Sequence, residues 1–327
     1  MSAGAAQRVG AGGGGLRRRW PWLAVGGLAL AVVVVLVARA ILDSPAGQDF
    51  LRAHSGVAPQ PAGTPVGFSA WTAWGHGLNA AFLFFAVRSG WRLHRAERPS
   101  TFWTRKNDGR LRTPGSPVRI SIDLWSHFVA DTLWALNGAV FLVLTVATGH
   151  WQRLLPTSWE VVPAAVSAGL QYAALQWPSE NGWIHYNALQ QLSYAGVVFV
   201  VGPLALLTGL RASPGLAARL RPLDARFSVR TAKRVHWWTM WVLVAFTAVH
   251  VLLVLATGAV RNLNHMYAVR DDQSPAGAIV FAVSLLLIAG VALALRPGVV
   301  RRAAALTGTV LHRPPRRPPG PRTPPAG

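Results

Sequence analysis

The segment RVHWWTMWVLVAFTAVHVLLVLATG (residues 234–258) is apolar after its first residues and carries two histidines. A helix of this length, rising about 1.5 Å per residue, is long enough to cross a hydrocarbon core of roughly 30 Å. His236 and His250 are 14 residues apart. At about 100° per residue they face nearly the same direction, about 21 Å apart along the axis. The segment therefore predicts a membrane helix that presents one histidine near each leaflet.

The composition of the 327 residues points to a membrane protein. Charged residues make up 13% and apolar residues 52%, whereas globular proteins average about 25% charged. The 15 tryptophans gather where apolar runs end, as in the aromatic belts of membrane proteins. We therefore expect an all-α integral membrane protein with six transmembrane helices, at 20–42, 69–91, 124–148, 186–210, 236–258 and 276–295.

Basic residues alternate between the connections and set the orientation. The N-terminal tail, the 92–119 loop, the 211–234 loop and the C-terminal tail hold 26 Lys and Arg, and the other connections hold 4. Cytoplasmic loops carry this excess, so both termini are predicted to be cytoplasmic and the protein to be a multi-pass protein of the plasma membrane. The net charge of +21 is thus a topology signal that attracts anionic lipid. It does not indicate nucleic-acid binding.

Low-complexity sequence marks the two ends of the chain. Residues 1–19 and the Pro/Arg-rich residues 303–327 are predicted to be disordered cytoplasmic tails. The 20–42 segment reads as an extra N-terminal transmembrane helix. Its basic start and the small residues at 37–40 also fit a signal peptide. Gly202 and Pro203 predict a kink within the fourth segment.

Four of the ten histidines fall inside predicted membrane helices. The helix directions place His76 and His250 in the outer leaflet. The same directions place His127 and His236 in the inner leaflet. Each leaflet therefore acquires one facing pair of imidazoles.

Facing imidazoles in a helix bundle are typical of b-type haem. A six-coordinate haem iron takes one axial nitrogen from each side of the ring. The absence of cysteine excludes thiolate ligands and covalently attached haem. Two haems b held by histidine in a four-helix bundle are therefore expected. Glycines that would admit the flat ring are Gly75, Gly77, Gly138 and Gly196, and basic residues that would meet its propionates are Arg119, Lys233 and Arg234.

The same segments resemble a known family of membrane cytochromes b. The resemblance rests on GHGLNAAFLFFAVRSG (75–90), SHFVADTLWALNG (126–138), TGHWQRLLP (148–156), HYNALQQLSY (185–194) and the 234–258 segment. They are similar to the thiosulfate reductase type of cytochrome b subunit, within the set that includes formate dehydrogenase gamma subunits and nickel-hydrogenase b-type cytochromes. The resemblance covers about 69–265 and implies a cytochrome b membrane domain over 69–295. It also implies that His76, His127, His236 and His250 are the haem ligands, and that quinone and a peripheral, commonly molybdopterin-type, oxidoreductase are the redox partners.

Several polar residues are further candidates for a quinone, propionate or proton site. Asp131 lies one turn after His127. It either relays protons or forms an ion pair with Arg88, and we favour the ion pair. Tyr186, Asn187 and Gln190 open the fourth segment and either bind quinone or propionate or cap the helix. His150 and His185 are expected to cap outer helix ends or to meet outer propionates.

The function predicted from these observations is electron transfer. The chain is expected to be a di-haem cytochrome b subunit of a respiratory-chain oxidoreductase complex. It would exchange electrons with menaquinone or ubiquinone rather than act as a stand-alone enzyme. A transporter or proton channel that uses the same His and Asp residues is the alternative, together with a haem-free membrane anchor. A transporter predicts broken helices and inverted repeats, which the sequence does not show.

Overall fold

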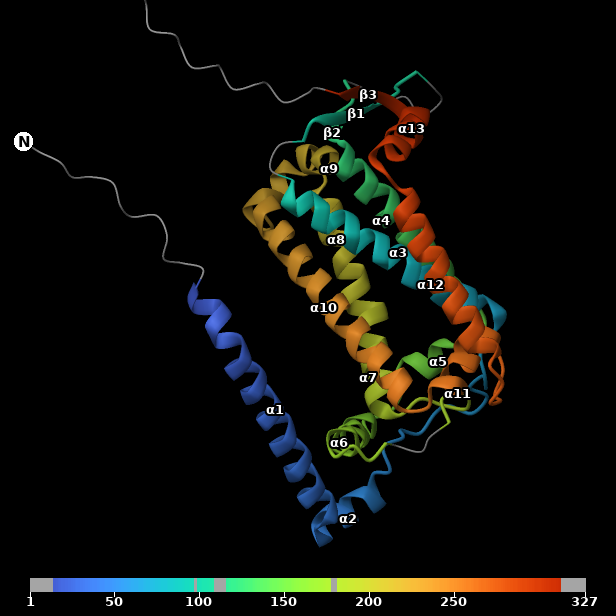
Figure 1. Ribbon diagram of the computed structural model, residues 1–327. Helices are drawn as coiled ribbons and strands as arrows, with labels where there is room; N and C mark the ends of the chain where they lie inside the picture. The colour runs from blue at the N-terminus through green and yellow to red at the C-terminus, as the bar shows by residue number, and fades with distance from the viewer. Residues whose placement is uncertain (1–13, 97–98, 109–115, 178–180, 313–327) are drawn as a thin grey trace, which may run out of the picture. The chain divides into compact units, whose positions relative to one another are not determined.

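A computed structural model describes residues 14–96, 99–108, 116–177 and 181–312 (Figure 1). Within these residues the protein is mostly helical, which confirms the predicted class. The chain forms two compact units. Unit 1 takes its described residues from 1–61, 156–181 and 186–192, and unit 2 takes them from 62–155, 182–185 and 193–327.

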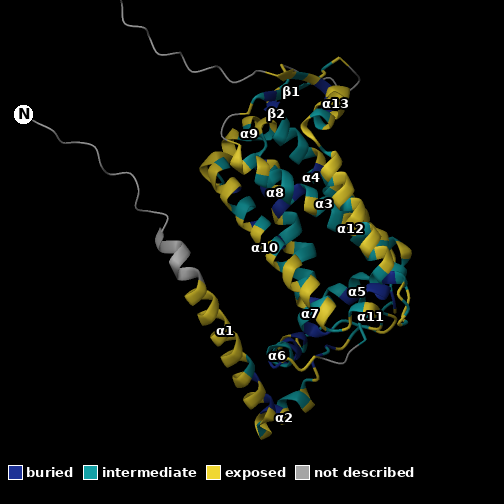
Figure 2. Ribbon diagram, viewed as in Figure 1, coloured by how far each residue is buried: buried dark blue, intermediate teal, exposed yellow. Residues whose placement is uncertain are grey.

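Unit 1 is built on one long helix and short helices that pack at its end. Leu42 and Ala38 of the long helix pack against Ala174. Gly47 allows the turn between the first two helices, because a Cβ there would lie 1.9 Å from the Ile41 carbonyl oxygen. From Trp22 onward the long helix exposes apolar side chains along most of its length (Figure 2), as a lipid-facing helix does. The helices are α1 (Gly14–Asp43), α2 (Pro45–Ala53), α6 (Val161–Ala173) and the first turns of α7 (Ala188–Gly196).

Unit 2 contains the helices that carry the four histidines. In it α3 (Ala70–Arg95) packs along α4 (Ile122–Ala147), and α10 (Val229–Ala256) packs along α8 (Gly202–Ala212). One π-helical turn, η1 (Val197–Val201), precedes Pro203 at the point where a kink was expected. The other helices are α5 (Trp151–Leu154), α9 (Pro214–Arg219), η2 (Arg221–Ala225), α11 (Ala259–Leu263), η3 (Asn264–Ala268), α12 (Ala276–Ala294) and α13 (Pro297–Thr307).

Five helices of the described residues are both long and apolar enough to cross a membrane. The sixth predicted span, α3, has 26 residues but is not among them. Polar residues such as His76 and Asn79 lower the hydropathy of its first half. The five spans are Pro21–Asp43, Ile122–Ala147, Ala188–Ala212, Val229–Ala256 and Ala276–Ala294.

A small sheet at one end of unit 2 was missed by the sequence analysis. Its three antiparallel strands, β1 (Thr101–Arg105), β2 (Arg119–Ser121) and β3 (Gly308–His312), have the order β2-β1-β3. Trp103 at its centre lies opposite Ile120 and Val310, and its Nε1 donates to the Ala304 carbonyl at 3.0 Å.

Two predicted tails are shorter than expected. Residues 14–19 already belong to α1. Residues 303–312 form the end of α13 and β3, because Gly308 lets the backbone pack directly on the Trp103 ring. The remainder of both predicted tails, 1–13 and 313–327, lies outside the described residues.

Candidate functional site

The structure brings the four helix histidines together in the two predicted pairs. His76 of α3 and His250 of α10 have ring centroids 6.1 Å apart, with ring planes at 37°. His127 of α4 and His236 of α10 have ring centroids 6.0 Å apart, with ring planes at 76°. All four residues belong to unit 2.

These separations fit two imidazoles on opposite sides of one metal ion. A metal–imidazole bond is about 2 Å long and the ring centroid lies about 1 Å beyond the nitrogen, so trans imidazoles have centroids about 6 Å apart. Direct stacking of two imidazoles would give a shorter separation. No group of three or more His, Cys, Asp or Glu that could hold a metal is present among the described residues. Two imidazoles fill two coordination positions of a metal ion, so each pair fits a macrocycle that supplies the other four.

The hydrogen bonds of the 127/236 pair are made through Nδ1 of each histidine. Nδ1 of His127 lies 3.1 Å from Ser89 Oγ. Nδ1 of His236 lies 3.0 Å from the Ala205 carbonyl oxygen and 3.3 Å from Thr208 Oγ1. A carbonyl only accepts, so His236 Nδ1 carries the proton and its Nε2 keeps the lone pair that a metal needs.

Aromatic rings surround the 76/250 pair. Phe246 stacks on His250 at 5.7 Å with planes at 8°, and Tyr194 meets His250 edge-on at 5.9 Å. Tyr267 lies 5.9 Å from His76. Nδ1 of His76 is buried and has no hydrogen-bond partner among the described residues. An unpaired buried nitrogen costs about 1–3 kcal/mol.

Asp131 is the carboxylate of this site, and its partner differs from the predicted one. Its Oδ2 lies 3.4 Å from Nε2 of His127. Arg88 instead donates to the Ala292 carbonyl at 3.3 Å, so the favoured Asp131–Arg88 pair is not among the ion pairs of the described residues. Since Nε2 is the nitrogen that would bind iron, the carboxylate has to turn away when His127 acts as a ligand.

Comparison with known proteins identifies the family. The sequence model of prokaryotic cytochrome b561 matches residues 67–268, which include all four histidines. The chain belongs to the prokaryotic cytochrome b561 family. It is also 29% identical over 200 residues to a putative protein-methionine-sulfoxide reductase subunit, YedZ1, of Azospira oryzae, covering 56% of this chain and 87% of the relative. No solved structure matches the chain.

Family membership settles the general character of the protein. It is a multi-pass membrane cytochrome b that binds haem b and takes part in electron transport. The predicted resemblance to membrane cytochromes b is confirmed at this level. Of the three predicted functions, the family favours electron transfer over a transporter or a haem-free anchor.

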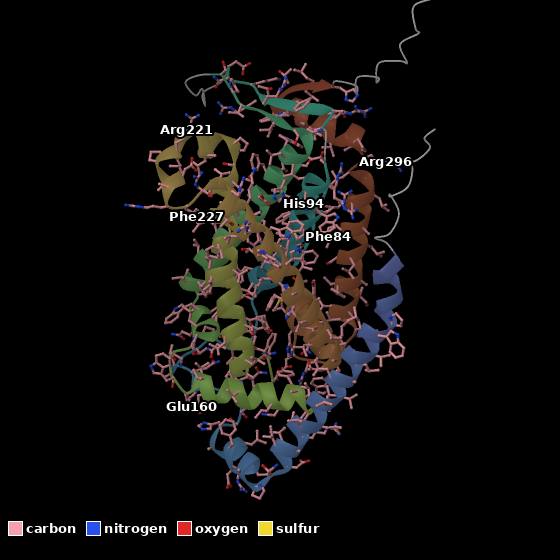
Figure 3. All side chains as sticks on the ribbon, turned by 90° about the vertical axis from the view of Figure 1, so that its left-hand side faces the viewer. Phe84, His94, Glu160, Arg221, Phe227 and Arg296 are labelled. Carbon is pink, nitrogen blue, oxygen red and sulfur yellow. The ribbon has the colours of Figure 1, made fainter. Side chains whose placement is uncertain are left out.

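The predicted basic residues lie at the end of this cytochrome b561 that carries the sheet. Lys233 and Arg234 occupy the first turns of α10 and are exposed. The Arg119 guanidinium lies over the Phe102 ring at 4.7 Å. Figure 3 shows Arg221 at the same end.

An aromatic cluster lies beside the 127/236 pair. His94 stacks on Trp237 at 4.2 Å, and Trp91 stacks on Trp237 at 5.8 Å. Trp241 meets both tryptophans edge-on. His94 is labelled in Figure 3, above Phe84 of the same helix. Since Trp237 follows His236 directly, this cluster holds α3 against α10 at the level of the pair.

The predicted Tyr186, Asn187 and Gln190 belong to unit 1. The Asn187 backbone N–H donates to Gln190 Oε1 at 3.1 Å, and the Gln190 N–H donates to Asn187 Oδ1 at 2.9 Å. This reciprocal pair is a capping box. Asn187 also donates to the Tyr172 hydroxyl at 3.0 Å. These contacts support the capping interpretation of Asn187 and Gln190.

Two further histidines lie at the opposite end of unit 2 from the sheet. His150 Nδ1 lies 2.9 Å from Thr148 Oγ1, and its ring meets Trp71 edge-on at 5.4 Å. Burial lowers the pKa of His150 below its usual value, and Arg153 adds to the effect. Nδ1 of His185 is buried without a partner among the described residues. The His150 side chain thus contacts the turn after α4, and a role in capping a helix end or in meeting a propionate stays a prediction.

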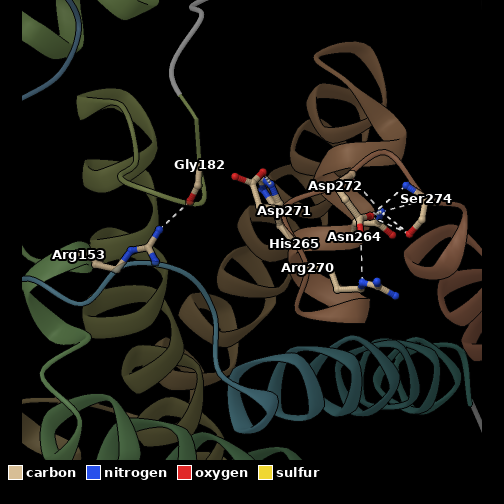
Figure 4. A network of polar contacts seen from close by, with 8 residues as sticks. All are labelled: Arg153, Gly182, Asn264, His265, Arg270, Asp271, Asp272 and Ser274. Carbon is tan, nitrogen blue, oxygen red and sulfur yellow. Dashed lines mark hydrogen bonds and ion pairs between the residues drawn. The ribbon is translucent and has the colours of Figure 1, made fainter.

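A polar network at this end holds the loops next to the 76/250 pair (Figure 4). Arg153 is 2% exposed and donates to the carbonyls of Gly67 and Gly182. His265, 3% exposed, pairs with Asp271 at 2.7 Å. Burial lowers the pKa of His265, and Asp271 partly offsets this. His265 is two residues from Tyr267, so the network fixes the segment that touches His76.

Four residues that contact the imidazoles of the 127/236 pair were not predicted. Ser89 and Thr208 contact the imidazoles of one pair, and Gly90 and Gly209 pack against the same rings. Of the glycines proposed from sequence, Gly75 and Gly77 lie near Phe141 and Tyr267, while Gly138 and Gly196 have nothing within 4 Å of a built Cβ. The sequence feature that could have indicated these four residues is a hydroxyl residue followed by glycine, which occurs on two helices as Ser89-Gly90 and Thr208-Gly209.

Proposed function

We propose that this cytochrome b561 holds two haems b, one between His76 and His250 and one between His127 and His236. The observation that carries this proposal is the pair of centroid separations of 6.1 and 6.0 Å across three helices. A haem supplies a reversible one-electron change at its iron. The protein fixes the imidazoles, keeps water away from them, and separates the pairs by 14 residues of α10, about 21 Å.

Redox partners on both sides follow from the proposed electron path. We propose exchange with quinone, menaquinone or ubiquinone, and with a peripheral oxidoreductase, as the resemblance of the sequence implies. The name of the Azospira oryzae relative, a putative reductase subunit, supports a peripheral redox partner. A molybdopterin cofactor in that partner is part of the proposal. The cytochrome would then act as an electron-transfer subunit of a respiratory complex.

We propose that both termini lie in the cytoplasm and that the protein resides in the plasma membrane. The strands β1 and β3 come from the 92–119 connection and the C-terminal segment, both predicted to be cytoplasmic from their basic residues. The pairing of these two strands supports the placement of both segments on the same side of the membrane. We further propose that the 20–42 segment within α1 remains as a transmembrane helix.

Haem content and spectroscopy test the proposal. Purified protein is expected to contain two haems b per chain by the pyridine haemochrome assay, and to show a reduced b-type spectrum. Magnetic anisotropy of low-spin ferric iron depends on the angle between its axial imidazole planes. Since these angles are 37° and 76°, electron paramagnetic resonance of the oxidised protein should show two different low-spin signals.

One haem per chain would contradict the two-site proposal, and a single low-spin signal from two equivalent haems would contradict the difference between the two imidazole angles. A high-spin ferric signal in intact protein would contradict ligation by two histidines. Both measurements use the complete chain in detergent.

A further inference from the structure

Two helices present the same kind of dipeptide to the 127/236 pair. Ser89 and Gly90 of α3 contact His127, and Thr208 and Gly209 of α8 contact His236. We call each of these dipeptides a hydroxyl–glycine cradle. The equivalence is not a sequence repeat, because the surrounding residues differ. It arises from helix packing, because α3 packs against α4, which carries His127, and α8 packs against α10, which carries His236.

The hydroxyl of each cradle has its own hydrogen directed elsewhere. Ser89 Oγ lies 2.7 Å from the Phe85 carbonyl and 3.0 Å from the Ala86 carbonyl. A hydroxyl has one hydrogen and carbonyls only accept, so that hydrogen is committed to the helix backbone. The oxygen can therefore only accept from His127 Nδ1–H, 3.1 Å away.

Thr208 repeats this arrangement on α8. Its Oγ1 lies 2.6 Å from the Leu204 carbonyl and 3.2 Å from the Ala205 carbonyl, and 3.3 Å from His236 Nδ1. The Ala205 carbonyl is a second acceptor for the same Nδ1, at 3.0 Å. Both cradles thus select the tautomer with the proton on Nδ1, leaving Nε2 as the ligand nitrogen.

The glycine of each cradle permits a close approach. A Cβ built on Gly90 would lie 3.1 Å from Cε1 of His127, and one built on Gly209 would lie 3.1 Å from Cε1 of His236. Carbon–carbon contacts are most favourable at about 3.5–4.0 Å. An alanine would therefore push either imidazole away by a few tenths of an ångström, so each glycine fixes the position of the ring.

The 76/250 pair lacks this support at one of its histidines. Nδ1 of His76 is buried and has no hydrogen-bond partner among the described residues. The two pairs therefore differ in the polarisation of their imidazoles. A histidine that donates Nδ1–H to an acceptor is a more basic ligand than one that does not.

We propose that the two hydroxyl–glycine cradles are positioning devices that lower the midpoint potential of the haem at the 127/236 pair. This inference rests on the proposed function, in which His127 and His236 ligate that haem. A more basic axial ligand stabilises ferric over ferrous iron, and hydrogen bonding of the ligands is one of the protein's means of setting a haem potential. Ser89 and Thr208 act through the histidines.

Redox titration of Ser89→Ala and Thr208→Ala tests the cradles. Ser89→Ala is expected to move one of the two haem midpoint potentials upward and leave the other unchanged. Thr208→Ala is expected to move the same potential by less, because the Ala205 carbonyl remains an acceptor for His236 Nδ1, and the double variant should move it further than either. Thr132→Ala is the matched control, because Thr132 makes the same bond to its own helix, to the Phe128 carbonyl, and is exposed on α4. It should titrate as the unmodified protein does.

Conservative variants separate positioning from damage to the fold. Ser89→Thr and Thr208→Ser keep the hydroxyl and are expected to retain the original potentials. Loss of one haem in the alanine variants but not in these variants also supports the cradles. Unchanged potentials in the double alanine variant, with both haems bound, would overturn the inference. Absence of haem from the unmodified protein would instead overturn the proposed function.

Alanine at the glycines provides an independent measurement. Gly90→Ala and Gly209→Ala are expected to shift one of the two low-spin resonance signals, because the ring that contacts the added methyl must move. Gly290→Ala on α12 is the control, since a Cβ there meets nothing within 4 Å. Identical spectra for all three variants would show that the glycines do not set the ring positions.

Discussion

His236→Ala is expected to leave about half of the b-type haem absorbance in the purified protein. The reason is that His236 faces His127. His250 lies on the same helix, 14 residues away, and belongs to the other pair. An iron that loses one of two axial nitrogens loses much of what holds its haem in the bundle. The measurement is the haem-to-protein ratio by the pyridine haemochrome assay.

The pairing itself is tested by double variants. His127→Ala/His236→Ala should still retain one haem, because both changes remove the same site. His76→Ala/His236→Ala should retain none, because each change removes a different site. His94→Ala is the control, since His94 stacks on Trp237 next to His236 without facing another histidine. Retention of both haems by His236→Ala would refute the ligand assignment.

The two histidine pairs could be predicted because two regularities of the sequence determine them. These are the period of the α-helix and the alternation of basic residues between successive connections. Helix geometry aligned His236 with His250, and the distribution of basic residues gave the helix directions that placed His76 and His127 opposite them. The structure places the rings 6.1 and 6.0 Å apart. Neither step required knowledge of how one helix is rotated against another.

The cradles could not be predicted because they depend on that rotation. Glycine is common in membrane helices, so Gly75 and Gly138 were as plausible as Gly90 and Gly209 until the helix phases were known. The same limit explains the incorrect pairing of Asp131 with Arg88, which assumed that similar depth means contact. Depth follows from sequence position, whereas facing requires the packing of α3 on α4.

The sheet escaped prediction for a different reason. Strands β1 and β3 are five residues each and are separated by about two hundred residues of chain. A strand of this length has little stability of its own, and pairing over such a separation leaves no local signal. Trp103 completes the arrangement by donating to the Ala304 carbonyl. The sheet therefore ties the C-terminal segment to the 92–119 connection.

Arg153→Met is expected to lower the stability of the cytochrome strongly. Arg153 is 2% exposed, donates to the carbonyls of Gly67 and Gly182, and lies over the Phe68 ring at 4.9 Å. Methionine keeps the apolar stem but leaves two carbonyls without this donor. Each unsatisfied buried group costs about 1–3 kcal/mol.

A cost of about 2–6 kcal/mol in total corresponds to a fall of several degrees in Tm for a chain of this size. Thermal unfolding in detergent, followed by circular dichroism at one scan rate, measures it. Arg52→Ala is the control, because Arg52 is 74% exposed and pairs with Asp49 on the surface of α2, where such pairs contribute about 0–1 kcal/mol. Equal Tm values for the two variants would mean that the Arg153 hydrogen bonds do not hold these loops. If Arg153 does hold them, the 76/250 haem should be released before the 127/236 haem on heating, because Arg153 lies in the loops next to the 76/250 pair.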